Sequence, residues 1–340
     1  MVLLRAQVAL CAACLALLCA GWAGALEGGK KVEFVAGYDR VDYGGWKDCV
    51  KIGGEKVEVV VTTPVGPRII RLALPGKENV FYEDPKTLGL TGGDTWRMYG
   101  GHRLWHAPEK RERTYPADNF PVTVHHLKDG VRFVPPPQKE NGVQLEIDVF
   151  VAKSEPYVKV VHRIENIGRW EIELAPWALS VCAAGGFAAI PQPTEYDPEY
   201  LLPNRAVVLW PYTSMDDPRI TWGRRFILVR QRAGTKPLKI GVTDNAGWIA
   251  YARKGTVFLK LYHYVRGAQY PDYGASVECY TNAEILEAET LGPLTRLAPG
   301  MSVEHVEHWF VWDGVDVRDT EESVAEQIVP LVERAREILG

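Results

Sequence analysis

The stretch VQLEIDVFVAKSEPYVKVVHRI, residues 143–164, decides the fold class. Its first half alternates apolar and polar side chains, its second half is rich in Val, and a short polar break at 153–156 separates the two. A period of two places successive side chains on opposite faces of an extended chain. The stretch therefore predicts two neighbouring β-strands, over residues 143–152 and 157–164.

Similar stretches recur along most of the chain, at 56–63, 67–74, 122–127, 131–134, 172–182, 206–210, 225–231, 238–242, 248–252, 256–265, 276–280 and 303–312. Residues 128–130 and 253–255 are typical of hairpin turns, because each offers a Gly for positive φ. Many short strands without helical patterns between them predict an all-β sandwich or barrel. No repeat or low-complexity linker divides the sequence, so we expect one domain over residues 26–340.

One helical pattern is present, at the C-terminus over residues 319–339. Asp319 is the predicted N-cap, with Glu322 three positions later. One apolar stripe, which we expect to pack on a sheet, follows from Val324, Ile328, Leu331, Ala335 and Ile338. Pro330 interrupts this stripe, so the segment is either kinked or divided into two short helices.

The N-terminus predicts export from the cytoplasm. Residues 1–25 hold one charge, Arg5, then an apolar run at 8–18 and the small residues AGA at 23–25. This order is typical of a secretory signal peptide, so we expect a periplasmic or secreted protein. No later stretch approaches the ~18 consecutive apolar residues that span a bilayer, so we expect no membrane span.

Charge and cysteine usage exclude other classes. The chain has 39 Lys and Arg against 43 Asp and Glu, and this mildly acidic balance argues against a nucleic-acid partner. Cys49, Cys182 and Cys279 follow the signal region, and three thiols cannot form a disulfide framework. Their apolar, strand-like surroundings favour free buried thiols, although a disulfide between two of them stays open.

The densest group of polar and aromatic side chains is TWRMYGGHRLWHAPE, residues 95–109. Its two adjacent glycines allow a sharp backbone turn. Trp offers a flat face to a sugar ring, Arg a planar fork of donors to hydroxyl oxygens, and His a proton near neutral pH. The candidate binding or catalytic residues of this segment are Arg97, His102, Arg103, Trp105 and His106. The alternative is a structural turn whose His residues bond to the backbone and whose Trp fills a core.

Metal and cofactor chemistry find no support in the sequence. His102, His106 and Glu109 are ligand types, but the spacing of the two His residues aligns them only on a helix, which Gly100, Gly101 and Pro108 disfavour. A nucleophile elbow, a Walker loop, a dinucleotide fingerprint and a Cys-x-x-Cys motif are all absent from the sequence. We therefore expect no metal and no cofactor.

Two later segments carry acidic residues. In AEILEAETLGPL, residues 283–294, a strand would place Glu287 and Glu289 on one face. Apolar neighbours would raise the pKa of such a carboxyl and make it a general base, whereas a solvated face is the alternative. Asp272 lies in the aromatic turn YPDYG at 270–274. His305 and Glu307 share a face of another strand, which we expect to be solvated.

Four motif groups occur in a specific order over residues 40–313: GGHRLW (100–105) with APE (107–109), APWAL (175–179), LPNR (202–205) with LWPY (209–212), and ETLGPL (289–294) with LAPG (297–300). Together they resemble an uncharacterised bacterial family, a domain of unknown function in the galactose mutarotase-like (aldose 1-epimerase-like) superfamily. The resemblance implies a β-supersandwich with a carbohydrate-binding cleft on its concave sheet.

The resemblance also implies a reaction. Aldose epimerases use a Glu base on the anomeric hydroxyl and a His acid on the ring oxygen. Glu289 lies where the epimerase base would fall, and His102 is similar in placement to an epimerase histidine. The epimerase acid usually lies in a mid-chain Asn-x-x-x-His segment, but this chain has Trp177 there, which cannot donate that proton and instead offers a stacking surface.

The sequence thus predicts an exported aldose 1-epimerase-like protein, with Glu289 as base and His102 as acid. A non-catalytic carbohydrate-binding protein is the alternative, and a glycan lyase or hydrolase is a third. The expected partner is a mono- or oligosaccharide, and the oligomeric state is open. The expected binding residues are Arg97, Arg103, Trp105, His106, Trp177 and Asp272. The hypothesis requires His102 and Glu289 to open into one hollow.

Overall fold

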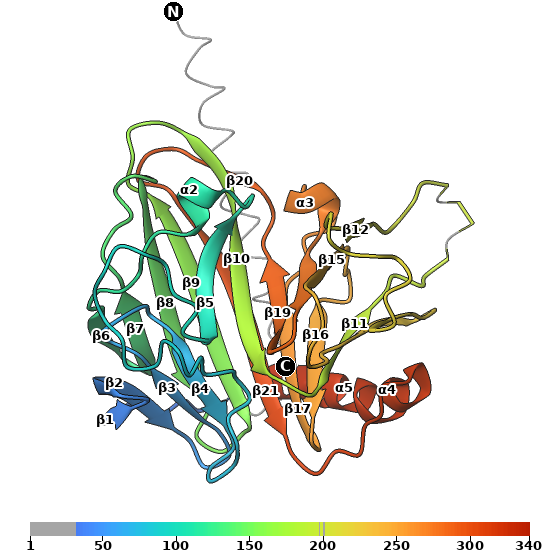
Figure 1. Ribbon diagram of the computed structural model, residues 1–340, viewed down its shortest axis with the longest axis horizontal. Helices are drawn as coiled ribbons and strands as arrows, with labels where there is room; N and C mark the ends of the chain where they lie inside the picture. Colours follow the sequence, from blue (N-terminus) through green and yellow to red (C-terminus); the bar gives the residue numbers. More distant parts are fainter. Residues whose placement is uncertain (1–31, 197, 200) are drawn as a thin grey trace, which may run out of the picture.

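The computed structural model describes residues 32–196, 198–199 and 201–340 (Figure 1). The predicted signal peptide at 1–25 lies outside the described residues. All 21 strands of the described residues pair into two antiparallel sheets. This architecture is the all-β sandwich that the alternating sequence pattern predicts.

The first sheet carries the candidate site. In spatial order its strands are β1 (Asp39–Tyr43), β2 (Trp46–Gly53), β3 (Glu58–Val61), β4 (Ile69–Ala73), β5 (Gly101–Ala107), β10 (Ile172–Ala183), β19 (Ile285–Leu291), β18 (Val277–Thr281), β15 (Leu238–Val242) and β12 (Val207–Leu209), with β20 (Thr295–Leu297) paired to β10. Two short helical turns, α2 (Arg111–Thr114) and α3 (Pro271–Gly274), lie in its connections.

The second sheet lies behind the first. Its order is β13 (Ile220–Trp222), β14 (Phe226–Arg230), β11 (Phe187–Pro191), β16 (Trp248–Arg253), β17 (Thr256–Tyr262), β21 (Ser302–Trp312), β9 (Tyr157–Asn166), β8 (Val143–Val151), β7 (Gly130–Val134) and β6 (Thr123–Leu127). Strands β8 and β9 are the two that residues 143–164 predict, and they pair with each other from Val143↔Asn166 to Val151↔Val158.

The main core lies between the sheets, where the inward side chains are mostly Val, Ile and Leu. Cys182 and Cys279 belong to this core, and Cys49 packs in a smaller cluster beside Trp46. All three thiols are free and buried. Among the described residues, no helix combines the length and the apolar character needed to cross a bilayer.

The C-terminal segment forms two helices, α4 (Glu321–Gln327) and α5 (Val329–Leu339), divided next to Pro330. Their buried residues Val324, Ile328 and Val332 pack on the outer face of the second sheet, as the apolar stripe predicts (Figure 1). The predicted N-cap is wrong by one residue, because Thr320 accepts the hydrogen bond from Ser323 N.

Candidate functional site

The register of three central strands decides which face each candidate residue occupies. In the pairing of β10 with β5 and β19, Leu179 lies opposite both Arg103 and Glu289. Because side chains alternate along a strand, these residues share the outer face of the first sheet with Trp105 and Trp177. The even-numbered residues of β5, including His102, face the core between the sheets.

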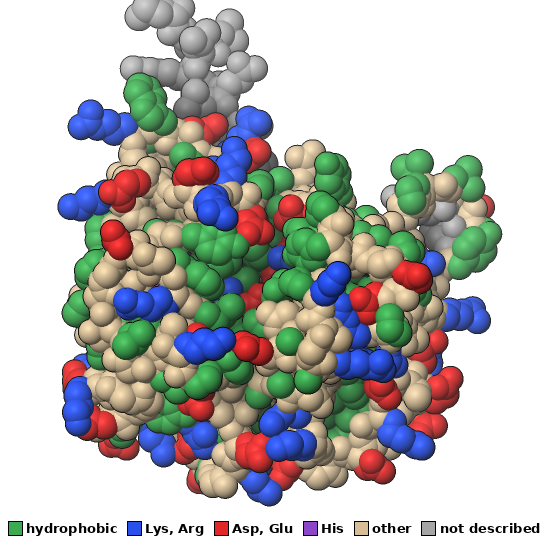
Figure 2. Space-filling model, in the orientation of Figure 1, with side chains coloured by type: hydrophobic (Ala, Val, Ile, Leu, Met, Phe, Trp, Pro, Cys, Tyr) green, Lys and Arg blue, Asp and Glu red, His purple; other side chains and the backbone are tan. Residues whose placement is uncertain are grey.

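A cleft of about 770 Å³ opens on this outer face, and it is the candidate site. It is lined by Asp94, Thr95, Trp96, Pro108, Glu109, Lys110, Arg111, Tyr115, Trp177, Trp210 and Asp272. Figure 2 shows the hollow in this view, with hydrophobic side chains around it and charged side chains inside it. Of the predicted residues, Trp177 and Asp272 line the cleft directly.

Aromatic rings form one continuous wall of the cleft. Trp96 meets Tyr115 edge to face with ring centroids 5.4 Å apart, and Trp105 meets Tyr115 and Trp177 at 4.9 and 5.5 Å. These distances are in the favourable range for aromatic pairs. The partly exposed Trp210, which follows β12, completes the wall from the other side.

A buried charge cluster, made of Lys239, Glu278 and Glu289, lies directly behind this wall. The ammonium of Lys239 lies 4.4 Å from the ring centroid of Trp177 and 4.7 Å from that of Trp210. Its Nζ is 2.6 Å from Oε2 of Glu278 and 3.1 Å from Oε2 of Glu289. The lysine is thus held by two carboxylates and two indole faces, an arrangement that favours its charged form.

The two glutamates of this cluster hold protons more tightly than ordinary carboxyl groups. Burial raises the pKa of Glu289, and Lys239 offsets only part of that effect. Burial likewise raises the pKa of Glu278 well above its usual value, against the opposing effect of Lys239. Trp177 Nε1 donates to Oε2 of Glu289 at 2.7 Å. The other carboxylate oxygen of Glu289, Oε1, has no hydrogen-bond partner among the described residues. Glu289 therefore has one oxygen available to take a proton.

Arg103 forms a second charged contact on the same face. Its Nη2 donates to Oε1 of Glu287 at 3.0 Å, and its guanidinium lies 4.2 Å from the ring centroid of Trp105. The prediction that Glu287 and Glu289 share one face is confirmed, although the face is buried instead of solvated. Arg103 thus supports the aromatic wall from behind.

The two remaining predicted binding residues outside the core have different positions. Arg97 donates to the carbonyl of Gly92 and to the hydroxyl of Tyr99, so it holds its own loop together. Asp272 lines the cleft from α3, where it and Tyr273 both have positive φ. Tyr273 is 92% exposed beside it.

The expected pairing of His102 with Glu289 is wrong. His102 is fully buried on the core face of β5, and its Nδ1 and Nε2 lie 2.9 Å from Ser180 Oγ and 2.7 Å from His162 Nε2. His106 faces the same way, and burial, with a smaller effect of Arg113, lowers its pKa to about 4. Neither histidine reaches the cleft, because an even-numbered position on β5 points away from it.

A second polar group, which we call the interior cluster, surrounds His102 between the sheets. It consists of His102, His162, Lys260, Thr290, His305 and Glu307. Lys260 Nζ lies 2.6 Å from Oε1 of Glu307, and Thr290 donates to the same oxygen at 2.5 Å. The expectation that His305 and Glu307 lie on a solvated face is therefore wrong. The sequence analysis did not single out His162 or Lys260, because nothing local marks either side chain as facing the interior.

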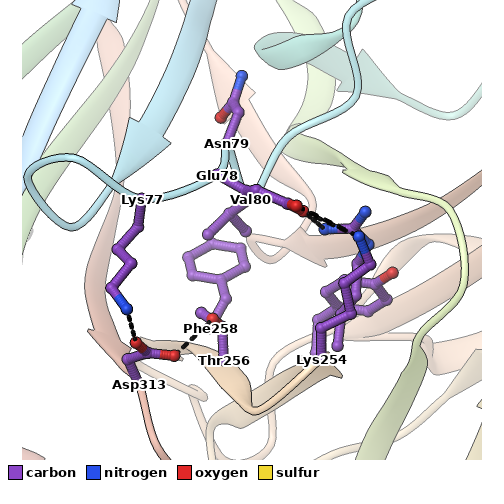
Figure 3. A pocket seen from close by; sticks show the side chains of 10 residues that line it. Lys77, Glu78, Asn79, Val80, Lys254, Thr256, Phe258 and Asp313 are labelled. Carbon is purple, nitrogen blue, oxygen red and sulfur yellow. Dashed lines mark hydrogen bonds and ion pairs between the residues drawn. The ribbon is translucent and has the colours of Figure 1, made fainter.

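A smaller pocket of about 240 Å³ lies elsewhere, between the connection from β4 to β5 and the turn from β16 to β17 (Figure 3). Its charges satisfy one another: Lys77 pairs with Asp313 at 2.8 Å, and Glu78 with Arg253 and Lys254 at 2.9 and 3.1 Å. All the charged side chains that line this pocket are thus paired with one another, so the cleft is the stronger candidate.

Comparison with known proteins assigns the fold. Neither a protein-family model nor a curated protein matches the sequence. Among solved structures, a galactose mutarotase-like protein from Lactobacillus casei is 11% identical with a TM-score of 0.52, over 78% of this chain and all of that one. A candidate aldose 1-epimerase from Klebsiella pneumoniae is 10% identical with a TM-score of 0.53, over 89% and 87%. A TPR-domain containing protein from Parabacteroides distasonis is 12% identical with a TM-score of 0.54, over 80% of this chain and 48% of that one.

These likenesses define the class of the molecule: it has the galactose mutarotase-like β-sandwich fold. At 10–12% identity they establish the fold alone. The uncharacterised family that the motifs resemble has no matching model.

Proposed function

We propose that this protein binds a carbohydrate in the outer-face cleft. The observation that carries the proposal is the wall formed by Trp96, Tyr115, Trp177 and Trp210, with Glu109 and Asp272 beside it. Indole and phenol faces stack against the C–H faces of sugar rings, and carboxylates accept hydrogen bonds from hydroxyl groups. The galactose mutarotase-like protein and the candidate aldose 1-epimerase that share this fold support the same class of ligand.

The test is binding of the purified protein to a panel of mono- and oligosaccharides, followed by calorimetry on any ligand found. Trp210→Ala removes a partly exposed ring of the wall and is expected to weaken binding at least tenfold. Trp170→Ala is the matched control, because this Trp is 80% exposed and lies outside the cleft. Equal affinities for the two variants, or no binding by the wild type, would contradict the proposal.

An aldose 1-epimerase-like reaction is the second candidate, and one observation favours it. Glu289 has a raised pKa, one oxygen without a hydrogen-bond partner among the described residues, and a place directly behind Trp177 of the cleft wall. These are properties of a general base. Since His102 lies on the other face, the acid of this reaction would come from another group at the cleft, such as Glu109 or Asp272.

Polarimetry on fresh α-glucose and α-galactose separates the two candidates. Catalysis predicts faster mutarotation with the wild type than with Glu289→Gln, while Glu284→Gln, an exposed substitution outside the cleft, keeps the wild-type rate. Equal mutarotation rates for the wild type and Glu289→Gln would contradict catalysis and leave carbohydrate binding as the proposed function. New reducing ends released from oligosaccharides would instead indicate a lyase or hydrolase.

We also propose, from residues 1–25 alone, that the protein acts in the periplasm or outside the cell.

A further inference from the structure

We propose that His102, His162 and Glu307 form a binding site for a divalent transition-metal ion at the centre of the sandwich. One ligand atom from each of these residues lies within 4.8 Å of the others. The three residues come from β5, β9 and β21, so both sheets contribute. This site is separate from the outer-face cleft and does not rest on the proposed function.

The ligand atoms converge closely on one point. His102 Nε2 lies 2.7 Å from His162 Nε2, and Oε2 of Glu307 lies 3.9 and 4.0 Å from the two nitrogens. Ligands about 2.0–2.1 Å from a tetrahedral Zn²⁺ lie about 3.3 Å from one another. Opening the nitrogen pair and drawing in the carboxylate by about half an ångström each therefore creates a coordination site.

The far side of each histidine ligand is already held by another group, and Oε2 of Glu307 itself accepts a hydrogen bond from Trp309 Nε1 at 2.8 Å. His162 Nδ1 lies 2.9 Å from the carbonyl oxygen of His305, which only accepts, so this nitrogen carries the proton. The lone pair of His162 Nε2 therefore points at His102, whose own Nδ1 contacts Ser180 Oγ. Metal-binding histidines are typically oriented in this way by a carbonyl, carboxylate or hydroxyl on the other ring nitrogen.

Metal binding leaves the proton count of the site unchanged. Because His162 Nε2 accepts, His102 Nε2 now donates the single proton between the rings, and Ser180 donates to His102 Nδ1. On metal binding the His102 proton moves to Nδ1, where Ser180 Oγ becomes the acceptor. Both imidazoles stay neutral throughout, which is the form that binds metal.

The donor set favours a particular class of ion. Two imidazole nitrogens with one carboxylate suit Zn²⁺ and its first-row neighbours, whereas Mg²⁺ and Ca²⁺ prefer all-oxygen ligands. Lys260 opposes binding, because its ammonium lies 2.6 Å from the other oxygen of Glu307. Removing that positive charge is therefore expected to strengthen metal binding.

The experiment measures Zn²⁺ itself. The full chain is unfolded in guanidinium with a chelator, then refolded with Zn²⁺, with Mg²⁺ or without metal, and its metal content and melting temperature are measured. We expect about one Zn²⁺ per chain and a raised melting temperature with Zn²⁺ but not with Mg²⁺. His162→Gln should lose both effects, and His125→Gln, an exposed His on β6, should keep them.

Lys260→Met supplies the decisive comparison if His162→Gln does not fold. A metal site predicts at least tenfold tighter Zn²⁺ binding by Lys260→Met than by the wild type. A purely structural cluster predicts no increase. Absence of Zn²⁺ from the refolded wild type, or equal Zn²⁺ content in wild type and folded His162→Gln, would overturn the proposal, whatever the result of the carbohydrate assays.

Discussion

At the scale of single residues, Lys239 holds the outer-face site together. Its buried ammonium contacts two carboxylates, Glu278 and Glu289, and both of these side chains are fully buried. Removing one member of a buried ionic group leaves the others without compensation in an apolar environment. The geometry of the aromatic wall thus depends on a charge that lies behind it.

Lys239→Met is expected to lower the free energy of unfolding by about 3–5 kcal/mol at pH 7. Part of this loss should be recovered at pH 5, because the stranded carboxyl groups then bind protons. Lys254→Met, in an exposed ion pair with Glu78, is the control and should leave stability almost unchanged. Urea unfolding measures the stability of both variants. A Lys239→Met variant as stable as Lys254→Met would contradict this role of Lys239.

The interior histidines predict acid sensitivity. Burial, opposed by Glu307, lowers the pKa of His305 to about 3, whereas an unfolded His titrates near 6.5. Between these values only the unfolded chain binds the proton, so stability falls as pH decreases from about 6.5. Each such histidine contributes about 1.4 kcal/mol per pH unit in this window.

His305→Gln tests this contribution directly, since Gln still offers a donor to Thr290. Urea unfolding between pH 7 and 5 should show a shallower loss of stability for the variant than for the wild type, by about one proton in the slope. The comparison of slopes removes the opposite contribution of Glu289, whose raised pKa is common to both proteins. Equal slopes of stability against pH for the wild type and His305→Gln would contradict the prediction, because they would show that His305 binds its proton equally in the folded and unfolded chain.

Sequence reasoning at this scale succeeded where one strand carried the whole signal. Glu287 and Glu289 share a face because they are two positions apart on one strand. It failed for His102, because both faces of β5 carry polar or aromatic groups and nothing local marks the inward one. It also failed for Glu307, whose burial depends on Lys260, a partner 47 positions away on another strand.

At the scale of elements, the C-terminal helices act as a cover for the second sheet. The outer face of that sheet is apolar around Phe226, Leu228 and Phe310, and α4 and α5 bury it. The sequence predicted these helices and their break well, because a helical stripe and a proline are local features. Their cap was misplaced by one residue, since Asp319 instead pairs with Arg230.

Ile328→Ala should therefore destabilise the whole molecule by about 2–5 kcal/mol, the usual cost of truncating a fully buried aliphatic side chain. Ile328 is fully buried in the joint between α4 and α5. Glu326→Ala, two positions earlier at an exposed site, is the matched control. Thermal unfolding of both variants checks the prediction, and equal melting temperatures would mean that the helices contribute little to the stability of the sandwich.

At the scale of the whole molecule, one sheet separates two polar sites. Strand β5 presents Arg103 and Trp105 to the cleft side and His102 to the interior cluster. The fold class followed from the sequence because alternation recurs in many strands. The position of the cleft could not be predicted from the sequence, because it depends on which face of each strand points away from the second sheet, and the two faces have similar side chains.

The two sites are expected to be energetically independent. Trp210→Ala should keep the Zn²⁺-dependent rise in melting temperature, and His162→Gln should keep wild-type affinity for any sugar that binds. Calorimetry and thermal unfolding on both variants measure this. A loss of sugar binding in folded His162→Gln would show that the two faces of the sheet are coupled through β5.

The alternation along β5 has a consequence for how this chain tolerates change. A single residue inserted or deleted at the start of β5 would shift the strand by one position, so that Arg103 and Trp105 would point between the sheets and His102 and His106 toward the cleft. A point substitution in β5 changes one face of the strand, whereas a shift of its register by one residue would disrupt the contacts on both faces. Length, more than composition, is what this strand must preserve.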